Sequence, residues 1–166
     1  MSHKNIFGQT LVALVTPMTA DGEVDWADTE KLIDYVISNG ADGVVVTGTT
    51  GETSTLTDAE KIKLVEVGKS VSAGRAKIIT GGGSNETAHA MQLYKASEKA
   101  GADGIMIVTP YYNKPTQKGL IAHYKAIAEA VSLPIYALGG LRPADVATAR
   151  RHGGQGVAGI RAFWPK

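Results

Sequence analysis

The feature that most constrains the fold is a junction that recurs where a helical pattern gives way to an apolar run. Asn39-Gly40-Ala41-Asp42-Gly43 and Ala100-Gly101-Ala102-Asp103-Gly104 are two such junctions, and His152-Gly153-Gly154-Gln155-Gly156 is a looser third. The first glycine of each fits a left-handed helix stop, after which the chain turns into a strand. A recurring helix-to-strand junction indicates repeated βα units, which form a parallel sheet covered by helices.

Strand-like and helical patterns alternate along the whole chain. The strand-like runs begin near Thr10, Gly43, Lys77, Gly104, Pro134 and Gly156. Helical patterns begin at Asp25 and at the capping box Thr57-Asp58-Ala59-Glu60, and three more cover residues from about 85 to 100, 117 to 131 and 143 to 152. Asp42 and Asp103 fall at the amino ends of strands, so we expect them to be turn and cap residues.

Six strands are fewer than the eight of a closed (βα)8 barrel. We therefore predict an α/β fold, a truncated TIM-type βα-barrel with six parallel strands and about five helices, as a single domain over residues 1–166. An open, doubly wound sheet is the alternative. Long exposed edges invite self-association, so we expect a homo-oligomer. In this oligomer the barrel either stays partial or is completed by another subunit.

Composition excludes several classes of protein. A net charge of +1 over 166 residues gives no electrostatic basis for binding nucleic acid or an anionic membrane. The chain has no cysteine, and its histidines lack metal-ligand spacing, so we predict neither a metal nor a cofactor. His89 and His123 are expected on helix surfaces. The residues from Met1 to Asn5 lack the apolar region of a signal peptide, so we expect a cytoplasmic protein.

A candidate binding segment follows the buried run Val44-Val45-Val46. Gly48 allows close approach of the backbone to a ligand, and Thr49 and Thr50 offer hydroxyl and N–H donors at the carboxyl end of a parallel strand. These groups suit a small anion, either a pyruvate-like carboxylate or a phosphate. A plain strand-to-helix turn is the alternative reading of the same residues.

Three motifs resemble the dihydrodipicolinate synthase / N-acetylneuraminate lyase family. They are Leu14-Val15-Thr16-Pro17, Gly48-Thr49-Thr50-Gly51-Glu52 and Val108-Thr109-Pro110-Tyr111-Tyr112-Asn113-Lys114-Pro115, and the resemblance extends over about residues 6–136. It implies a (βα)8 barrel with class I aldolase chemistry, in which a lysine forms a Schiff base with pyruvate.

The resemblance also implies roles for individual residues. Thr49 and Thr50 would hold the carboxylate of pyruvate, and Tyr112 would reach into the site of a neighbouring subunit as part of a proton relay. Leu138 occupies the place of the family's second relay tyrosine, and Tyr136, two residues earlier on the same strand face, is a poor substitute.

From about residue 136 to residue 164 the sequence resembles the end of thiamine phosphate synthase. The matching pieces run from Tyr136 to Val146 and from Gly156 to Phe163. The resemblance implies phosphate binding by Gly139, Gly140, Gly159 and Ile160. The alternative is a glycine turn with Pro143 at the first helical position.

The lysines decide which chemistry is expected. A Schiff-base lysine must be desolvated and must face the substrate, whereas Lys61 and most others fall on helices and are expected to be solvated. Lys77 begins a strand at the end opposite the site, and Lys114 lies on a loop at the catalytic end. We therefore predict a shortened or chimeric relative without the parent activity. An active pyruvate-dependent lyase and a phosphate-ester-binding protein or transferase are the alternatives.

Overall fold

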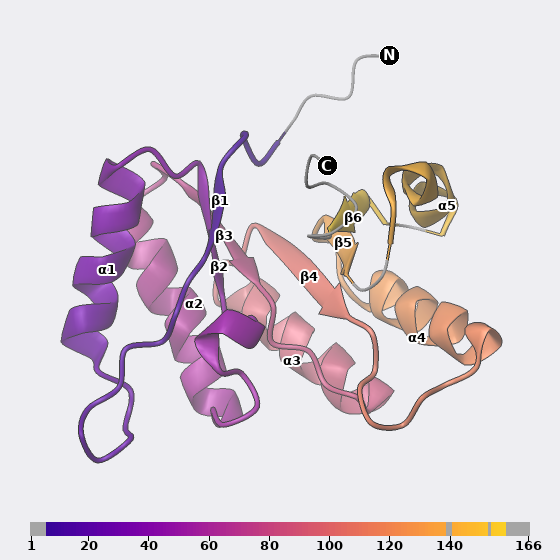
Figure 1. Cartoon of the computed structure of the whole chain (residues 1–166), viewed down its shortest axis with the longest axis horizontal. Coiled ribbons are helices and arrows are strands. Elements are labelled where there is room, and N and C mark those ends of the chain that lie inside the picture. Colours follow the sequence, from indigo (N-terminus) through magenta and orange to yellow (C-terminus); the bar gives the residue numbers. More distant parts are fainter. Residues whose placement is uncertain (1–5, 139–140, 153, 159–166) are drawn as a thin grey trace.

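A computed structural model describes residues 6–138, 141–152 and 154–158, which form one parallel sheet with helices packed against it (Figure 1). The strand order is β1-β2-β3-β4-β5-β6. The six strands are β1 (Leu11–Ala13), β2 (Gly43–Val46), β3 (Lys77–Thr80), β4 (Gly104–Val108), β5 (Ile135–Leu138) and β6 (Gly156–Ala158). All six begin within one residue of the predicted starts.

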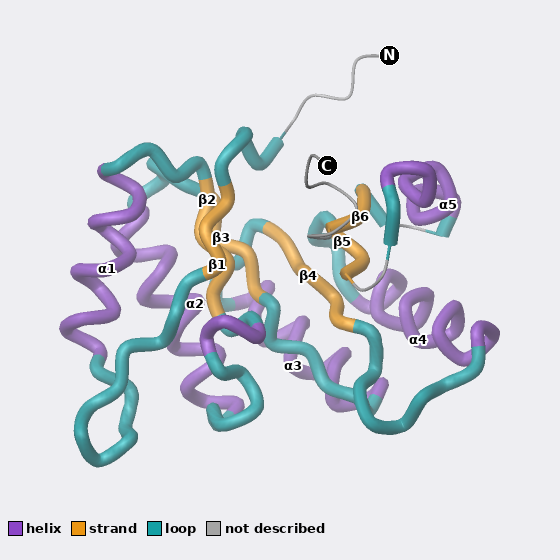
Figure 2. The backbone as a smooth tube through the Cα atoms, viewed as in Figure 1, coloured by secondary structure: helices purple, strands orange, loops and turns teal. Residues whose placement is uncertain are grey.

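Five α-helices connect the strands. They are α1 (Trp26–Ser38), α2 (Asp58–Ser72), α3 (Thr87–Lys99), α4 (Gln117–Ala130) and α5 (Val146–Arg151). The predicted capping box is present at the start of α2, where Thr57 and Glu60 bond reciprocally. Two short 3-10 helices, η1 (Thr49–Gly51) and η2 (Pro143–Asp145), precede α2 and α5. Figure 2 shows that the loops after β2, β3 and β4 lie along the same side of the sheet.

The strand order distinguishes between the two predicted architectures. Each strand pairs in parallel with the one before it, as in the registers Val12↔Val44 and Val44↔Ile78, and the order never reverses. A doubly wound sheet would require a reversal, so that alternative is wrong. The described chain forms an open half of a TIM-type barrel, with β1 and β6 as its edges.

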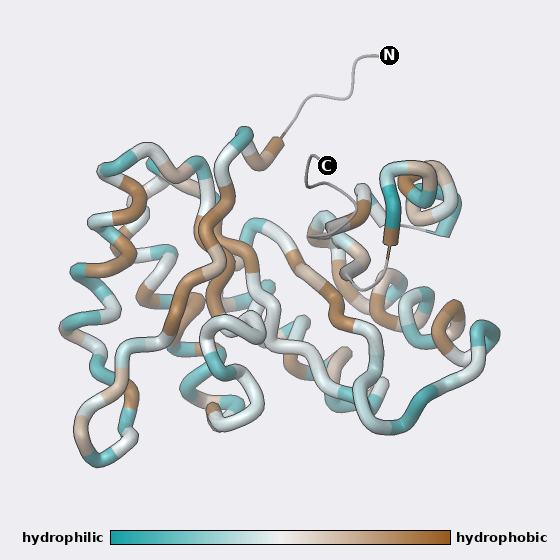
Figure 3. The backbone as a smooth tube through the Cα atoms, viewed as in Figure 1, coloured by the Kyte–Doolittle hydropathy of each residue, from teal (hydrophilic) through white to brown (hydrophobic). Residues whose placement is uncertain are grey.

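Alternate residues of each strand pack in two different layers. Val44, Val46 and Ile78 face the helices and belong to the core under α1 and α2, and Ile105 and Ile107 form a second core with α3 and α4. The other side is the concave inner face, where Phe7, Val45 and Ile79 are buried together. Figure 3 shows the resulting concentration of hydrophobic residues along the strands.

The junction carboxylates are structural, as predicted. Asp42 accepts hydrogen bonds from the N–H groups of Gln9 and Thr10, which lower the pKa of its carboxyl. Asp103 accepts from Ile78 N–H and pairs with Lys69 at 2.9 Å and with Lys77 at 3.4 Å. Burial alone would raise the pKa of Asp103, but these donors and cations together hold it below its ordinary value.

Candidate functional site

The carboxyl end of β2 is shaped by Thr47, a residue that the sequence reasoning did not single out. Thr47 has φ of +58°, although it is β-branched and not glycine, and it is buried. Its hydroxyl lies 2.6 Å from the carbonyl oxygen of Val46, to which it donates, and 3.1 Å from the hydroxyl of Thr80. A left-handed β-branched residue is strained, and these bonds hold the turn in place.

Beyond Thr47, the predicted anion-binding residues Thr49 and Thr50 lie in the turn η1, and Gly48 is the N-cap residue before it. Thr49 and Thr50 are exposed, whereas Gly48 and Gly51 are buried. Gly51 packs against the end of β1, where its carbonyl oxygen accepts a hydrogen bond of 2.8 Å from the Thr16 hydroxyl. We call residues 47–51 the β2 rim. Its outward-facing groups are the side chains of two threonines, which suit a small oxyanion.

The loop that follows β3 packs directly against the β2 rim. A β-carbon on Gly81 would lie 2.9 Å from the Cα atom of Gly48, a distance that real side chains do not tolerate. Glycine at position 81 therefore allows the two backbones to touch. This contact places the buried run Gly81-Gly82-Gly83-Ser84 beside the rim, where we predicted the exit loop of the third strand.

Lys61 is buried, so the prediction that it lies on a solvated face is wrong. Its side chain is only 11% exposed, because the aliphatic stem lies under the loop at Gly82. The ammonium group is 3.6 Å from the carboxylate of Asp58, which also lies 2.6 Å from His89 Nε2. The hydrogen bond from His89 and the nearby Lys61 lower the pKa of Asp58. The spacing Asp58-x-x-Lys61, one helical turn, was a signal for this pair.

Tyr112 lies on the loop between β4 and α4 and points away from the rest of the chain. It is 93% exposed and has φ of +68°. The loop is tied to α3 through Asn85, which donates to the carbonyl oxygen of Tyr111 and accepts from the side chain of Asn113. Lys114, on the same loop, is also exposed. The structure does not bring Tyr112 to the β2 rim within this chain.

Tyr136 belongs to the inner face and not to the rim. Its ring packs edge-to-face on Phe7, with 5.5 Å between centroids, and burial raises the pKa of its phenol. Phe7 in turn lies against Gly104, the first residue of β4. Tyr136 is therefore directed toward the amino ends of the strands, whereas Thr49 and Thr50 are at the carboxyl ends.

His123 is also buried, contrary to the prediction of a surface histidine. Its Nδ1 atom is 2.9 Å from the Thr87 hydroxyl, which links α4 to α3, and burial lowers the pKa of its imidazole. His123 lies four residues before the buried Ile127, and this helical spacing was a signal for its burial.

The structure does not place the predicted phosphate site, and its described residues contain neither a candidate metal site nor a membrane-spanning helix. Gly139, Gly140, Gly159 and Ile160, the predicted phosphate ligands, lie outside the described residues. Within residues 6–138, 141–152 and 154–158 no group of three or more histidines and carboxylates could hold a metal. None of the helices in these ranges has the length and apolar character needed to cross a membrane.

None of the described strands carries a lysine near the β2 rim that could act as a nucleophile. Lys77 is the one lysine in a described strand, and it lies at the amino end of β3 in the ion pair with Asp103. The rim presents hydroxyl groups, and the described strands present no amine for imine formation there.

Comparisons with known proteins identify the family. The model of the dihydrodipicolinate synthetase family matches residues 6–147. The 4-hydroxy-tetrahydrodipicolinate synthase of Synechococcus sp. is 50% identical over 129 residues, which are 78% of this chain and 42% of the relative. The enzyme of the same name from Moorella thermoacetica is 49% identical over 129 residues, 78% of this chain and 44% of the relative.

Solved structures agree with the fold. Dihydrodipicolinate synthase from Thermotoga maritima superposes with a TM-score of 0.86 at 36% identity, over 93% of this chain and 55% of that one. The chloride-inhibited synthase from Acinetobacter baumannii complexed with pyruvate gives 0.77 at 49% identity, over 78% and 45%. The chain spans less than half the length of the curated relatives that it matches. It belongs to the dihydrodipicolinate synthetase family.

Proposed function

We propose that this half-barrel chain, a relative of dihydrodipicolinate synthase, binds a small carboxylate at the β2 rim without itself catalysing the parent reaction. The observation that carries the proposal is that Thr49 and Thr50 are both exposed on one turn. The strained residue Thr47 and the close packing of Gly81 fix the backbone of that turn. Pyruvate is the first ligand to test, because a similar synthase has been solved in complex with it.

The loss of parent activity follows from the chemistry of imine formation. A class I aldolase needs an unprotonated amine facing the bound keto acid. Lys61 is buried near the rim, but its ammonium group lies 3.6 Å from the Asp58 carboxylate and not against the rim threonines. Lys114 is exposed on the loop after β4 and is not enclosed against a bound ligand. Tyr136 packs against Phe7, away from the rim.

Borohydride trapping tests this proposal. The protein is incubated with pyruvate and sodium borohydride and its intact mass is measured, while pyruvate binding is followed separately by NMR. We expect saturable binding with no covalent adduct. A reduced adduct would show that the protein is an active pyruvate-dependent lyase or retains its first step, and peptide mapping would then identify the lysine. Absence of binding would reject the proposal that the β2 rim binds a carboxylate.

Matched variants locate the binding. Thr49→Val and Thr50→Val each remove one rim hydroxyl, and we expect pyruvate binding to weaken about three- to tenfold for each. Thr55→Val is the control, because Thr55 lies in the same loop and donates its hydroxyl to Glu52. Equal binding by all three variants would place the ligand elsewhere.

We also propose that residues 136–164 are a thiamine-phosphate-synthase-like segment, joined to the first part in a single chimeric domain. On this proposal Gly139, Gly140, Gly159 and Ile160 bind phosphate. The support is the sequence resemblance together with the helix start at η2, three residues after Gly140. Calorimetry with inorganic phosphate and thiamine phosphate tests it, and no heat at millimolar ligand would reject it.

We further propose that the protein is a homo-oligomer. Leu11 and Val15, on and just after the edge strand β1, are 44% and 53% exposed, and apolar side chains at an edge strand favour pairing with another copy. In such an assembly the exposed Tyr112 would extend toward the rim of a neighbouring subunit. Sedimentation equilibrium gives the mass in solution, and a strict monomer would contradict this proposal.

A further inference from the structure

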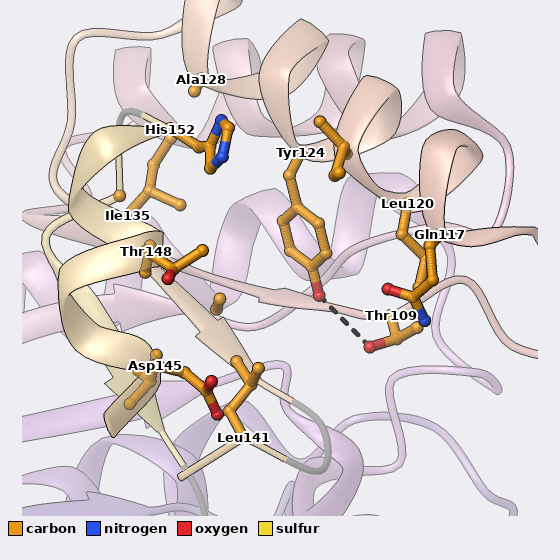
Figure 4. A pocket seen from close by; sticks show the side chains of 15 residues that line it. Thr109, Gln117, Leu120, Tyr124, Ala128, Ile135, Leu141, Asp145, Thr148 and His152 are labelled. Atoms are coloured by element: carbon orange, nitrogen blue, oxygen red, sulfur yellow. Dashed lines mark hydrogen bonds between the residues drawn. The ribbon is translucent and has the colours of Figure 1, made fainter. Parts of the chain in front are cut away.

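A cavity lies on the helix-covered side of the sheet, on the opposite face from the concave inner surface. It has a volume of about 450 Å³ and opens between α4 and α5 (Figure 4). This size falls within the usual range for small-molecule sites, about 300–1,000 Å³. Its walls are mainly apolar, with side chains from both helices and from β5 and β6, among them Leu120, Ile121, Ile135, Ala137, Leu141 and Val157.

The sequence explains why this space is not filled. Helix α5 has only six residues, and it packs on β6, whereas the longer α4 packs on α3. The residues that face the space include Ala128, Ala137, Ala149 and Gly154, none of which is large enough to close it. The gap between the two helices is therefore a product of helix length and of small side chains.

One end of the cavity carries neutral hydrogen-bonding groups. The hydroxyls of Thr109 and Tyr124 lie 3.3 Å apart, and Gln117 stands next to them (Figure 4). The Tyr124 hydroxyl points from α4 toward the end of β4, below the apolar wall. Burial raises the pKa of its phenol, so the group stays protonated; it donates to the carbonyl oxygen of Ile107 at 3.5 Å, and its oxygen is an acceptor for a ligand hydroxyl.

The charges around the cavity disfavour an anionic ligand. No lysine or arginine among the described residues lines it, so a carboxylate or phosphate would be desolvated there without a compensating cation. Asp145, the one carboxylate that the described residues contribute to the wall, already accepts a hydrogen bond of 2.8 Å from the backbone N–H of Arg142. His152, at the other end, is exposed to solvent. The polar groups at the end near Tyr124 are hydroxyls and an amide, whereas Asp145 and His152 line other parts of the wall (Figure 4).

We propose that the cavity between α4 and α5 binds a neutral, mainly apolar molecule that carries a hydroxyl group. Its apolar part lies between Ile135, Leu141 and Val157, and the hydroxyl bonds to Tyr124 and Thr109 at the polar end. This site is separate from the β2 rim in position and in chemistry, because the rim offers exposed hydroxyls to a small anion at the carboxyl end of β2.

The test uses 2-naphthol as the neutral probe and 2-naphthoate as its anionic counterpart, with the whole chain. NMR titration follows the backbone amides. We expect 2-naphthol to bind with a dissociation constant below about 1 mM, as bounded by its few non-hydrogen atoms, and to shift signals within residues 117–128 and 145–157. We expect 2-naphthoate to bind at least about tenfold more weakly.

Two variants separate the polar end from the apolar walls. Tyr124→Phe keeps the ring and removes the hydroxyl, and it should weaken 2-naphthol binding about three- to tenfold. Ala149→Leu fills the cavity from α5 and should weaken binding more than about tenfold. Ala147→Leu places the same side chain on an exposed position of the same helix, outside the cavity, and should leave binding within about twofold of the unmodified protein.

Each result decides for or against the site. Equal affinity for 2-naphthol and 2-naphthoate, unchanged binding by Tyr124→Phe, or signal shifts confined to residues 47–51 would overturn the proposal. Circular dichroism checks that the Ala149→Leu protein folds. If it does not, the Tyr124→Phe titration and the location of the shifts still give the answer.

Discussion

The hydroxyl of Thr47 lies 3.1 Å from the hydroxyl of Thr80, and both are buried where β2 and β3 end. The backbone N–H of Gly82 also points to the Thr80 hydroxyl, at 3.5 Å. This pair connects the strained turn at Thr47, with φ of +58°, to the loop that follows β3. The shape of the β2 rim therefore depends on a polar contact beneath it as well as on the threonines that face solvent.

Removing the hydroxyl of Thr80 should destabilise the protein. Thr80→Val keeps the shape of the side chain but leaves the hydroxyl of Thr47 and the N–H of Gly82 without this partner, at a cost of about 1–2 kcal/mol in the free energy of unfolding. Thr53→Val is a matched control, because the Thr53 hydroxyl is buried without a hydrogen-bond partner among the described residues. That substitution should be neutral or stabilising by up to about 1 kcal/mol. Urea denaturation measures both, and equal losses would contradict this account.

The contact between the two loops gives a second prediction. Gly81→Ala places a β-carbon 2.9 Å from the Cα atom of Gly48, and neither backbone can move without disturbing the rim. We expect a loss of about 1–3 kcal/mol in unfolding free energy and weaker pyruvate binding. Gly119→Ala is the control, because its β-carbon would meet nothing closer than 3.4 Å in helix α4, where alanine is favoured by up to about 1 kcal/mol. A stable Gly81→Ala protein with unchanged binding would show that this contact does not shape the site.

Buried His123 predicts a pH-dependent stability. Burial lowers the pKa of His123 below its ordinary 6.5, so in the unfolded chain the imidazole takes up a proton at a higher pH than in the folded chain. The unfolding free energy should therefore fall as the pH drops below about 6.5, and this contribution is fully present only above that value.

Two substitutions test the source of this pH dependence. His123→Gln keeps a hydrogen-bonding group near Thr87 but cannot take up a proton, so the loss of stability between about pH 7 and pH 5 should be smaller than in the unmodified protein. His152→Gln, at an exposed histidine, should leave the pH dependence as it is. An identical slope with His123→Gln would assign the effect to other groups.

The fold was predictable because its signals are local. Apolar runs such as Val44-Val45-Val46 and the Gly-Ala-Asp-Gly junctions specify strands and helix ends without reference to distant residues, and the sequential strand order follows from the barrel resemblance. The first strand-like run, predicted to begin near Thr10, forms a strand of only three residues, Leu11–Ala13. After Leu14, which still donates to the carbonyl oxygen of Val45, the chain leaves the sheet toward Pro17.

Features that depend on tertiary packing were not predictable in this way. Lys61 and His123 carry polar groups on helices, and their burial depends on the loop at Gly82 and on Thr87 of α3. The direction of Tyr136 is set by its contact with Phe7, which lies more than a hundred residues earlier in the sequence. The cavity between α4 and α5 depends on the length of α5 and on four small residues from separate elements.

The burial of Lys61 predicts that its stem matters more than its charge. Lys61→Met retains an apolar stem beneath the Gly82 loop and loses the pair with Asp58, whose half-exposed carboxylate makes the pair weak, so we expect a change below about 1 kcal/mol. Lys61→Ala removes the stem and should cost about 1–2 kcal/mol. Thermal unfolding of the two variants compares these effects, and a larger loss in Lys61→Met would show that the ion pair dominates.

The edge strand predicts how the proposed oligomer can be dissociated. Val15 is 53% exposed just beyond β1, and a lysine there would place a charge in any contact that another copy makes along this edge. We expect Val15→Lys to shift the sedimentation profile to the monomer while the circular dichroism spectrum stays the same. Tyr35→Lys is the control, because Tyr35 is 64% exposed on α1, in the helical layer and not on the edge strand, and its replacement should leave a strand-edge contact intact. If Tyr35→Lys dissociates the oligomer and Val15→Lys does not, the contact involves the helical layer and the edge of the half-barrel stays open.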